Sequence, residues 1–421
     1  MSSFEFNTRD WFEGTAPEEL AVTSNSLSVA VNGKVVTYLL NKAIKSTSNE
    51  VYLPLYPVAE WIAANWWRLL YECNPHRDVE SFQTCHNLKY AGEGYFLPDL
   101  LLAPEIDVVH LTWNERAINH GELSFLGYGS ENIPFEDVKN ELARFVRFVI
   151  GRLLANNISD TPLQKDWAAI EASTRDAEER DFCIACAQLG FDPYCISASC
   201  ADEIIEADER LSGKISLGEF FNTVAPGHIK ASVEWLEQIG TADSKNSAFN
   251  NELRRIKELL PDFSHALPWE RGYKEARWVR ANFFKTQSAF RDFQQKMMAE
   301  TFQKTVPFSL CSALVETSEK QTPMFISTSQ KNNFLAGRML GEYLHSSADH
   351  INLVTKVSTP SQKRCRAFSA ELNAPAEWLK RDLNGKRLVC DDDIAELAEK
   401  YQVNELVVKY QLVNHNLAAV L

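Results

Sequence analysis

A carboxylate and two imidazoles stand close together in the sequence near residue 345. Glu342 and His345 are three residues apart, a spacing that places both side chains on one face of a helix, and His350 follows five residues later. Carboxylate oxygens and imidazole nitrogens are ligands for divalent transition metals, so these three residues form one candidate metal site. The other interpretation is that Glu342 and His345 belong to an ordinary polar helix face.

Four cysteines, Cys183, Cys186, Cys195 and Cys200, form a second candidate site. Four thiolates are a complete ligand set for a structural zinc ion. Zinc ribbons present their C-x-x-C pair on a tight turn, however, whereas the residues around Cys183 and Cys186 have the pattern of a helix interior. We therefore favour buried, reduced thiols, in keeping with an odd total of nine cysteines.

Basic side chains gather near the C-terminus, where they could contact the phosphates of a nucleic acid. The alternative, which we favour, is a solvated face that Glu371, Glu377 and Asp391–Asp393 partly neutralise. The cluster consists of Lys363, Arg364, Arg366, Lys380, Arg381, Lys386 and Arg387.

The composition is that of a globular chain with a strongly acidic body. The 421 residues are 45% hydrophobic, enough for two or three domains with cores of their own. Residues 1–269 hold 22 Lys and Arg against 40 Asp and Glu, whereas residues 270–421 hold 21 against 17. An acidic body repels phosphate backbones, so a nucleic-acid partner is not favoured and would have to bind the C-terminal part.

Neither a membrane span nor a secretory signal is expected. The apolar run from Val51 to Ala64 is interrupted by Pro54, Pro57 and Glu60, well short of the roughly 18–20 apolar residues that a span needs. The first residues lack a basic start and an apolar stretch. We expect a cytoplasmic protein without membrane contact, and the sequence does not indicate its oligomeric state.

The predicted fold class is α+β with three domains. Asn32-Gly33 lies between two β-branched runs and predicts a type I′ hairpin. A helix is expected over 58–70 and another over 135–154, with strands over 92–102 and 107–113. Residues 1–157 therefore form a mixed sheet-and-helix domain, and the helical periodicity that follows predicts an all-helical middle domain over 158–262.

The C-terminal domain, residues 263–421, is expected to be mostly helical with a small sheet. Two short strands are predicted on either side of Thr322-Pro323, and Ser329 is expected to cap a helix that runs to about His345. Further helices are predicted over 363–372, from Pro375 and from Asp393.

Three stretches of this domain resemble, in order and spacing, the ImmA/IrrE-type metallopeptidase family. The family pattern has an H-E-x-x-H helix, a later Glu before F-A-A-E-L, and a short C-terminal helix pair. In a working member two His and the later Glu hold zinc, and the Glu within the motif is the general base. The resemblance implies a zincin-like fold. The matching stretches are Phe334–His345, Ala367–Glu377 and Ile394–Val403.

The residues that would perform the family's chemistry are missing. On the family pattern, Arg338 and Glu342 fall at the two His positions and Met339 falls at the general base. The distal carboxylate falls among Gln362, Lys363 and Arg364, none of which is acidic. Arg338 and Glu342 are four residues apart, so they either pair with each other or both face solvent. We expect no cofactor and no peptide hydrolysis by the family mechanism; zinc would have to bind elsewhere.

The resemblance implies a non-catalytic pseudo-metallopeptidase that binds a protein partner. Such a protein would be an interaction, sensor or regulatory component of a bacterial stress-response, toxin–antitoxin or phage-defence system. One alternative is a metal-dependent peptidase or hydrolase with a non-standard site. Another is a nucleic-acid-binding regulator that uses the C-terminal basic cluster.

Overall fold

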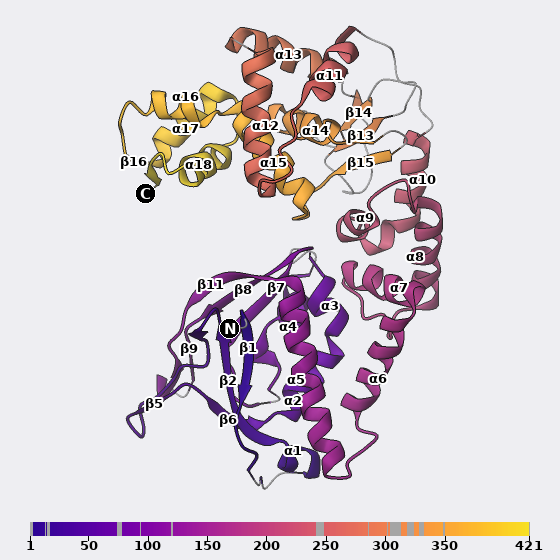
Figure 1. Cartoon of the computed structure of the whole chain (residues 1–421), viewed down its shortest axis with the longest axis vertical. Helices are drawn as coiled ribbons and strands as arrows, with labels where there is room; N and C mark the ends of the chain where they lie inside the picture. The colour runs from indigo at the N-terminus through magenta and orange to yellow at the C-terminus, as the bar shows by residue number, and fades with distance from the viewer. Residues whose placement is uncertain are drawn as a thin grey trace. The chain divides into compact units, whose positions relative to one another are not determined.

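The chain divides into two compact units, Met1–Ile205 and Glu206–Leu421. Each contains helices and small sheets, which confirms the predicted α+β class (Figure 1). The helices expected to form a middle domain are shared between the two units. The computed structural model describes residues 3–12, 14, 17–73, 78–92, 94–118, 121–240, 248–284, 286–300, 302–303, 313–317, 324–327, 332–347 and 350–420.

Antiparallel sheets make up much of the first unit. The predicted hairpin at Asn32-Gly33 is confirmed, because both residues have positive φ angles of 46° and 77° and join two paired strands. The first sheet has the order β1-β2-β3 with β6 beside β2, the second β5-β4-β10-β9 and the third β11-β8-β7. The strands are β1 (Phe4–Thr8), β2 (Ser24–Val31), β3 (Lys34–Val35), β4 (Leu39–Asn41), β5 (Ser46–Ser48), β6 (Val51–Pro54), β7 (Asp99–Pro104), β8 (Val108–Asn114), β9 (Arg116–Ile118), β10 (Leu123–Phe125) and β11 (Gly129–Pro134).

Helices complete the first unit and share its hydrophobic core. The long helix predicted over 135–154 is confirmed, but the one predicted over 58–70 is interrupted at Asn65. The amide of Asn65 donates to the Trp61 carbonyl at 2.8 Å, and such a side-chain bond competes with continued helix. The helices are α1 (Glu18–Val22), α2 (Tyr56–Ala64), α3 (Trp66–Tyr71), α4 (Val79–His86), α5 (Phe135–Ala155), α6 (Pro162–Arg175), α7 (Ala177–Gln188) and α8 (Ala198–Leu211), the last of which extends across the unit boundary.

The second unit is mainly helical. Its helices are α9 (Leu217–Thr223), α10 (Ile229–Gly240), α11 (Ala248–Leu259), α12 (Pro268–Phe283), α13 (Gln287–Glu300), α14 (Asn333–Tyr343), α15 (Pro360–Asn373), α16 (Ala376–Asp382), α17 (Asp391–Tyr401) and α18 (Glu405–Asn414). Among the residues described, no helix is both long and apolar enough to cross a bilayer.

One four-stranded sheet lies in the second unit, together with a short strand pair. The strand order is β12-β14-β13-β15, and only the contact between β12 and β14 is parallel. The two predicted strands are confirmed as β13 and β14, whereas β15 was not predicted. The strands are β12 (Phe302–Gln303), β13 (Ala313–Thr317), β14 (Met324–Ser327), β15 (His350–Val354), β16 (Leu388–Val389) and β17 (Ala419–Val420).

The cap predicted at Ser329 was wrong. The helix begins at Asn333, and the side chain of Asn332 accepts a hydrogen bond from the Leu335 amide. Asparagine is as good an N-cap as serine, and Asn332 is the residue directly before the helix, so it is the N-cap. Ser329 itself lies outside the described residues.

Two glycines let helices of the second unit approach closely. A Cβ on Gly272 of α12 would lie 2.3 Å from the backbone oxygen of Arg364 on α15. On α14, a Cβ on Gly337 would lie 2.5 Å from the hydroxyl of Ser369, also on α15. Helix α15 is therefore held against both α12 and α14, and its side chains lie among theirs.

Candidate functional site

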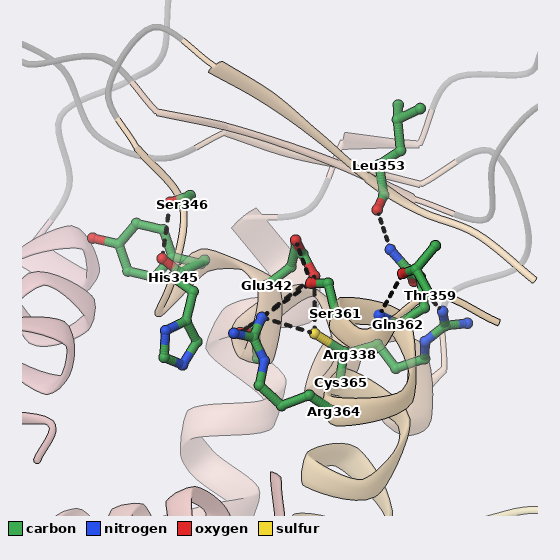
Figure 2. Close-up of polar contacts among 12 residues, drawn as sticks. Arg338, Glu342, His345, Ser346, Leu353, Thr359, Ser361, Gln362, Arg364 and Cys365 are labelled. Carbon is green, nitrogen blue, oxygen red and sulfur yellow. Dashed lines mark hydrogen bonds and ion pairs between the residues drawn. The ribbon is translucent and has the colours of Figure 1, made fainter. Parts of the chain in front are cut away.

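Helix α14 places the residues at the resembled zinc positions inside the second unit. The side chains of Arg338 and Glu342 are only 7% and 8% exposed, so the prediction that both face solvent was wrong. Their partners also differ from the predicted Arg338–Glu342 pair. Each binds residues of α15 or of the segment that precedes it, as Figure 2 shows. Met339 at the resembled base position is part of the hydrophobic core.

Arg338 is bound to the residue at the distal-carboxylate position. Its Nη2 donates to the side-chain oxygen of Gln362 at 2.6 Å and to the carbonyl of Thr355. Gln362 is fully buried and completes its own bonding by accepting from the Thr355 amide and donating to the carbonyl of Leu353 at 2.6 Å. Burial lowers the pKa of Arg338 to about 10, so the guanidinium stays charged at neutral pH.

A second carboxylate, Glu219 of α9, joins this network. It accepts a hydrogen bond from the hydroxyl of Thr359 at 2.6 Å and one from Gln362 Nε2 at 3.2 Å. Thr359 is the N-cap of α15, since its side chain accepts from the Gln362 amide. Burial raises the pKa of Glu219 to about 7. Glu219 therefore changes its charge near neutral pH while buried.

Glu342 is engaged by three residues of α15. Its carboxylate accepts from the hydroxyl of Ser361 at 2.9 Å and from the thiol of Cys365 at 2.9 Å. The guanidinium of Arg364 lies 3.7 Å away and forms a buried ion pair with it. Burial raises the pKa of Cys365, which keeps that thiol protonated as a donor. Both carboxylate oxygens of Glu342 thus have partners within the protein.

His345 belongs to a separate triad with the partly exposed Arg271 and the buried Glu275 of α12. Arg271 Nη2 lies 2.9 Å from His345 Nδ1, and His345 Nε2 lies 2.9 Å from Glu275 Oε1. Because a guanidinium only donates, Nδ1 must accept and Nε2 must carry the proton. Burial lowers the pKa of His345, consistent with this neutral tautomer. Burial alone would raise the pKa of Glu275, but hydrogen bonds from His345 and Arg271 outweigh it and lower that pKa.

The donor set at the resembled zinc positions does not fit zinc. A guanidinium has no lone pair to offer a metal, and Gln362 uses its side-chain oxygen for Arg338 and Thr355. A cation next to the charged Arg338 would also be repelled. No metal-dependent step can be derived from these residues.

The alternative metal set is not brought together. His345 is held by Arg271 and Glu275, Glu342 by residues of α15, and His350 lies on β15. Within the described part of the chain, no group of three or more His, Cys, Asp or Glu side chains is arranged to hold a metal.

The four-cysteine set falls on two helices and a loop. Cys183 and Cys186 are buried inside α7, Cys195 is exposed in the loop that follows, and Cys200 is partly exposed on α8. Burial raises the pKa of Cys183 to about 12, so its thiol stays protonated. The buried pair behaves as small apolar side chains of a helix interior.

The structure divides the basic cluster among four locations. Arg364 is buried against Glu342, so it cannot serve as a surface cation. Lys363 and Arg366 line one groove, whereas Lys380, Lys386 and Arg387 line a second cavity near the chain end. Lys386 forms an ion pair there with Asp393 at 2.5 Å, and Arg381 is exposed on α16.

The first of these cavities is a groove of about 800 Å³ in the second unit. It lies among α12, α14, α15, α18 and the loop before α18, and no Asp or Glu is found among its described lining residues. Trp269, Leu406 and Tyr410 contribute unusually exposed apolar surface, with exposed fractions of 45%, 57% and 61%. The groove is also lined by Tyr273, Asn332, Phe334, Lys363, Arg366, Ala367, Ala370, Gln402, Val403, Asn404, Val407, Gln411 and Asn414.

Several residues of these networks were not singled out from the sequence. Thr359-Pro360 is a helix-start signal that could have identified the α15 cap. Glu219 gave no such signal, because its partners Thr359 and Gln362 lie about 140 residues away. The groove could not be recognised either, since it is formed by residues of four separate helices and of the loop before α18.

No family model, curated protein or solved structure matches the chain. The likeness to ImmA/IrrE-type metallopeptidases therefore rests on the residue pattern of the C-terminal part.

Proposed function

We propose that this chain is a non-catalytic interaction protein whose second unit binds an extended, acidic peptide segment of a partner protein. The observation that carries the proposal is the groove of about 800 Å³, which combines exposed aromatic and aliphatic side chains with Lys363 and Arg366. Contiguous exposed apolar surface of this kind marks interaction sites in globular proteins. The regulatory role implied by the ImmA/IrrE resemblance is compatible with such binding.

The chemistry of the lining selects the occupant. Apolar side chains of a peptide would pack on Trp269, Leu406 and Tyr410, which also supply the aromatic anchors common at interfaces. Lys363 and Arg366 give the groove positive charge, and no Asp or Glu is found among its described lining residues. This charge favours an acidic ligand. Amide side chains such as Asn404 and Asn414 can satisfy the backbone groups of an extended segment.

The absence of catalysis is supported by the contacts of Arg338, Glu342 and Gln362. All three are buried and bound to protein partners, and a guanidinium cannot activate water as a metal does. Elemental analysis of the natively purified protein tests this part. Stoichiometric zinc together with chelator-sensitive peptide cleavage would overturn it.

Selection from a random displayed-peptide library against the full chain tests the groove. The expected consensus contains Asp or Glu beside apolar residues, and its synthetic peptide should bind at least about tenfold more weakly after Leu406→Ala with Tyr410→Ala. Val413→Ala is the matched control, because Val413 lies on the same helix, is exposed, and does not line the groove. A consensus that binds the double variant unchanged, or that lacks acidic residues, would refute the proposal.

A nucleic acid in the same groove is the competing outcome. Binding of a fluorescent single-stranded DNA would weaken steeply with salt and would depend on Lys363 and Arg366. If that DNA binds and displaces the selected peptide, the peptide assignment is wrong.

A further inference from the structure

The first unit contains a pocket of about 350 Å³ that the interaction function does not use. It is formed by α3, α5, α6 and α7, which are labelled in Figure 1. Its volume falls in the range of roughly 300–1,000 Å³ that is typical of small-molecule sites, and sites between helices are common.

Aromatic rings form much of the pocket wall and hold one another in position. Trp66 and Trp167 meet edge to face with ring centroids 5.0 Å apart, and Trp67 stacks on Tyr71 at 6.0 Å. The three tryptophans are buried, so their positions are fixed by the core around them. Another planar ring can pack against the parts of these side chains that line the pocket.

Cations line the same pocket. Arg147 lies over the Trp167 ring at 5.4 Å, and Glu171 is the one carboxylate among the described lining residues. The Glu171 carboxylate already accepts from Trp167 Nε1 at 3.1 Å and pairs with Arg147 at 3.2 Å. The four cations are Lys139, Arg147, Arg175 and Arg180.

This positive pocket contrasts with the unit that contains it. Residues 1–205 hold 15 Lys and Arg against 30 Asp and Glu, a net charge of −15. Four of those fifteen cations nevertheless line one small pocket that has a single carboxylate. Each of them also pairs with a carboxylate, Lys139 with Glu136, Arg147 and Arg175 with Glu171, and Arg180 with Asp181, so an anion in the pocket would share these cations.

We propose that this pocket binds a planar aromatic ring that carries a phosphate or a similar anionic group, as a mononucleotide does. The ring would pack against the tryptophan and tyrosine side chains that line the pocket. The anionic group would receive charge-assisted hydrogen bonds from the arginines, whose forked guanidinium matches phosphate oxygens. The first unit thus contains a ligand site of its own, which can serve as a sensor input.

Isothermal titration calorimetry of the full chain with four probes tests the site. Adenosine monophosphate and 1-naphthyl phosphate carry both a ring and a phosphate, whereas adenosine and inorganic phosphate carry only one of these groups. We expect each of the first two probes to bind at least about tenfold more tightly than either of the last two. A preference for adenosine monophosphate over 1-naphthyl phosphate would identify the ligand as a nucleotide, and equal binding would identify an aromatic phosphate in general.

Arg175→Ala combined with Arg180→Ala should weaken binding of adenosine monophosphate about tenfold or more. Both side chains are largely exposed, at 78% and 42%, so the fold should tolerate the change. Lys165→Ala on α6 is the control, because this exposed cation does not line the pocket. Binding of neither ring-bearing phosphate at millimolar concentration, or unchanged binding by the double variant, would overturn the proposal.

Discussion

The guanidinium of Arg338 lies 2.6 Å from the side-chain oxygen of Gln362, and both residues are buried. In the family pattern that the sequence resembles, Arg338 stands at the position of a zinc-binding histidine, and Gln362 stands in the region of the distal carboxylate. A direct hydrogen bond therefore links α14 and α15 at these positions.

The energetic coupling of this pair can be measured with a double-mutant cycle. Gln362→Leu leaves the buried Arg338 charge without its amide partner, which should lower the free energy of unfolding by about 1–3 kcal/mol. Arg338→Met combined with Gln362→Leu removes the charge as well and should recover at least about 1 kcal/mol of that loss. Urea unfolding of the wild type, both single variants and the double variant provides the cycle. Additive effects would show that the two residues do not act together.

Glu219 should make the protein less stable as the pH rises. Its pKa is raised from 4.5 to about 7 in the folded protein. Between pH 4.5 and pH 7 the folded state therefore keeps a proton on this carboxyl group, whereas the unfolded chain has released it. The free energy of unfolding therefore falls across this window by up to about 3 kcal/mol and levels off above it. Glu219→Gln removes the titrating group. The free energy of unfolding of the variant minus that of the wild type should therefore increase from pH 5 to pH 8. A difference that stays constant over this range would contradict the assignment.

His345 should be mainly neutral in the folded protein at pH 6.5, because burial lowers its pKa from the ordinary value. The contacts with Arg271 and Glu275 require the proton on Nε2. Nitrogen NMR of labelled histidine should show an Nε2–H tautomer at pH 6.5. Arg271→Gln, which removes the neighbouring cation, should raise the pKa of His345. An imidazolium signal in the wild type at that pH would contradict the described geometry.

Gly272 and Gly151 form a matched pair of helical glycines with opposite expectations. An added Cβ at Gly272 meets the Arg364 backbone at 2.3 Å, whereas one at Gly151 of α5 meets nothing within 4 Å. Gly272→Ala should destabilise the protein by about 1–3 kcal/mol through overpacking. Gly151→Ala should stabilise it by up to about 1 kcal/mol, because alanine is the better helix former. Thermal unfolding of the two variants should show melting temperatures that move in opposite directions.

Local sequence signals were sufficient to predict elements that depend only on residues close together in the sequence. The Asn32-Gly33 turn was predicted because both residues tolerate positive φ, and the long helix α5 because its apolar residues recur with helical spacing. The interruption at Asn65 was missed, since it depends on a side-chain bond to Trp61 that competes with the helix.

For the candidate site, the sequence predicted which ligands are missing but not the contacts of the residues that replace them. The sequence identified Arg338, Met339 and Glu342 as replacements, but it did not show where these side chains would find partners. The polar partners of Arg338 and Glu342 lie on α15 and on the segment before it, and the burial of Arg364 changed the interpretation of the basic cluster. Pairings across such distances depend on tertiary packing, which spacing along one helix does not contain.

The hydrogen bonds from Thr359 and Gln362 to Glu219 also determine where the chain can be cut. A recombinant fragment that starts at residue 263, the boundary expected from the sequence, would expose the α15 cap and lack the carboxylate beneath it. A fragment that starts just before Ala198 would keep that carboxylate, the whole of α8 and the second unit. Gene fusions and expression libraries should place their junction there.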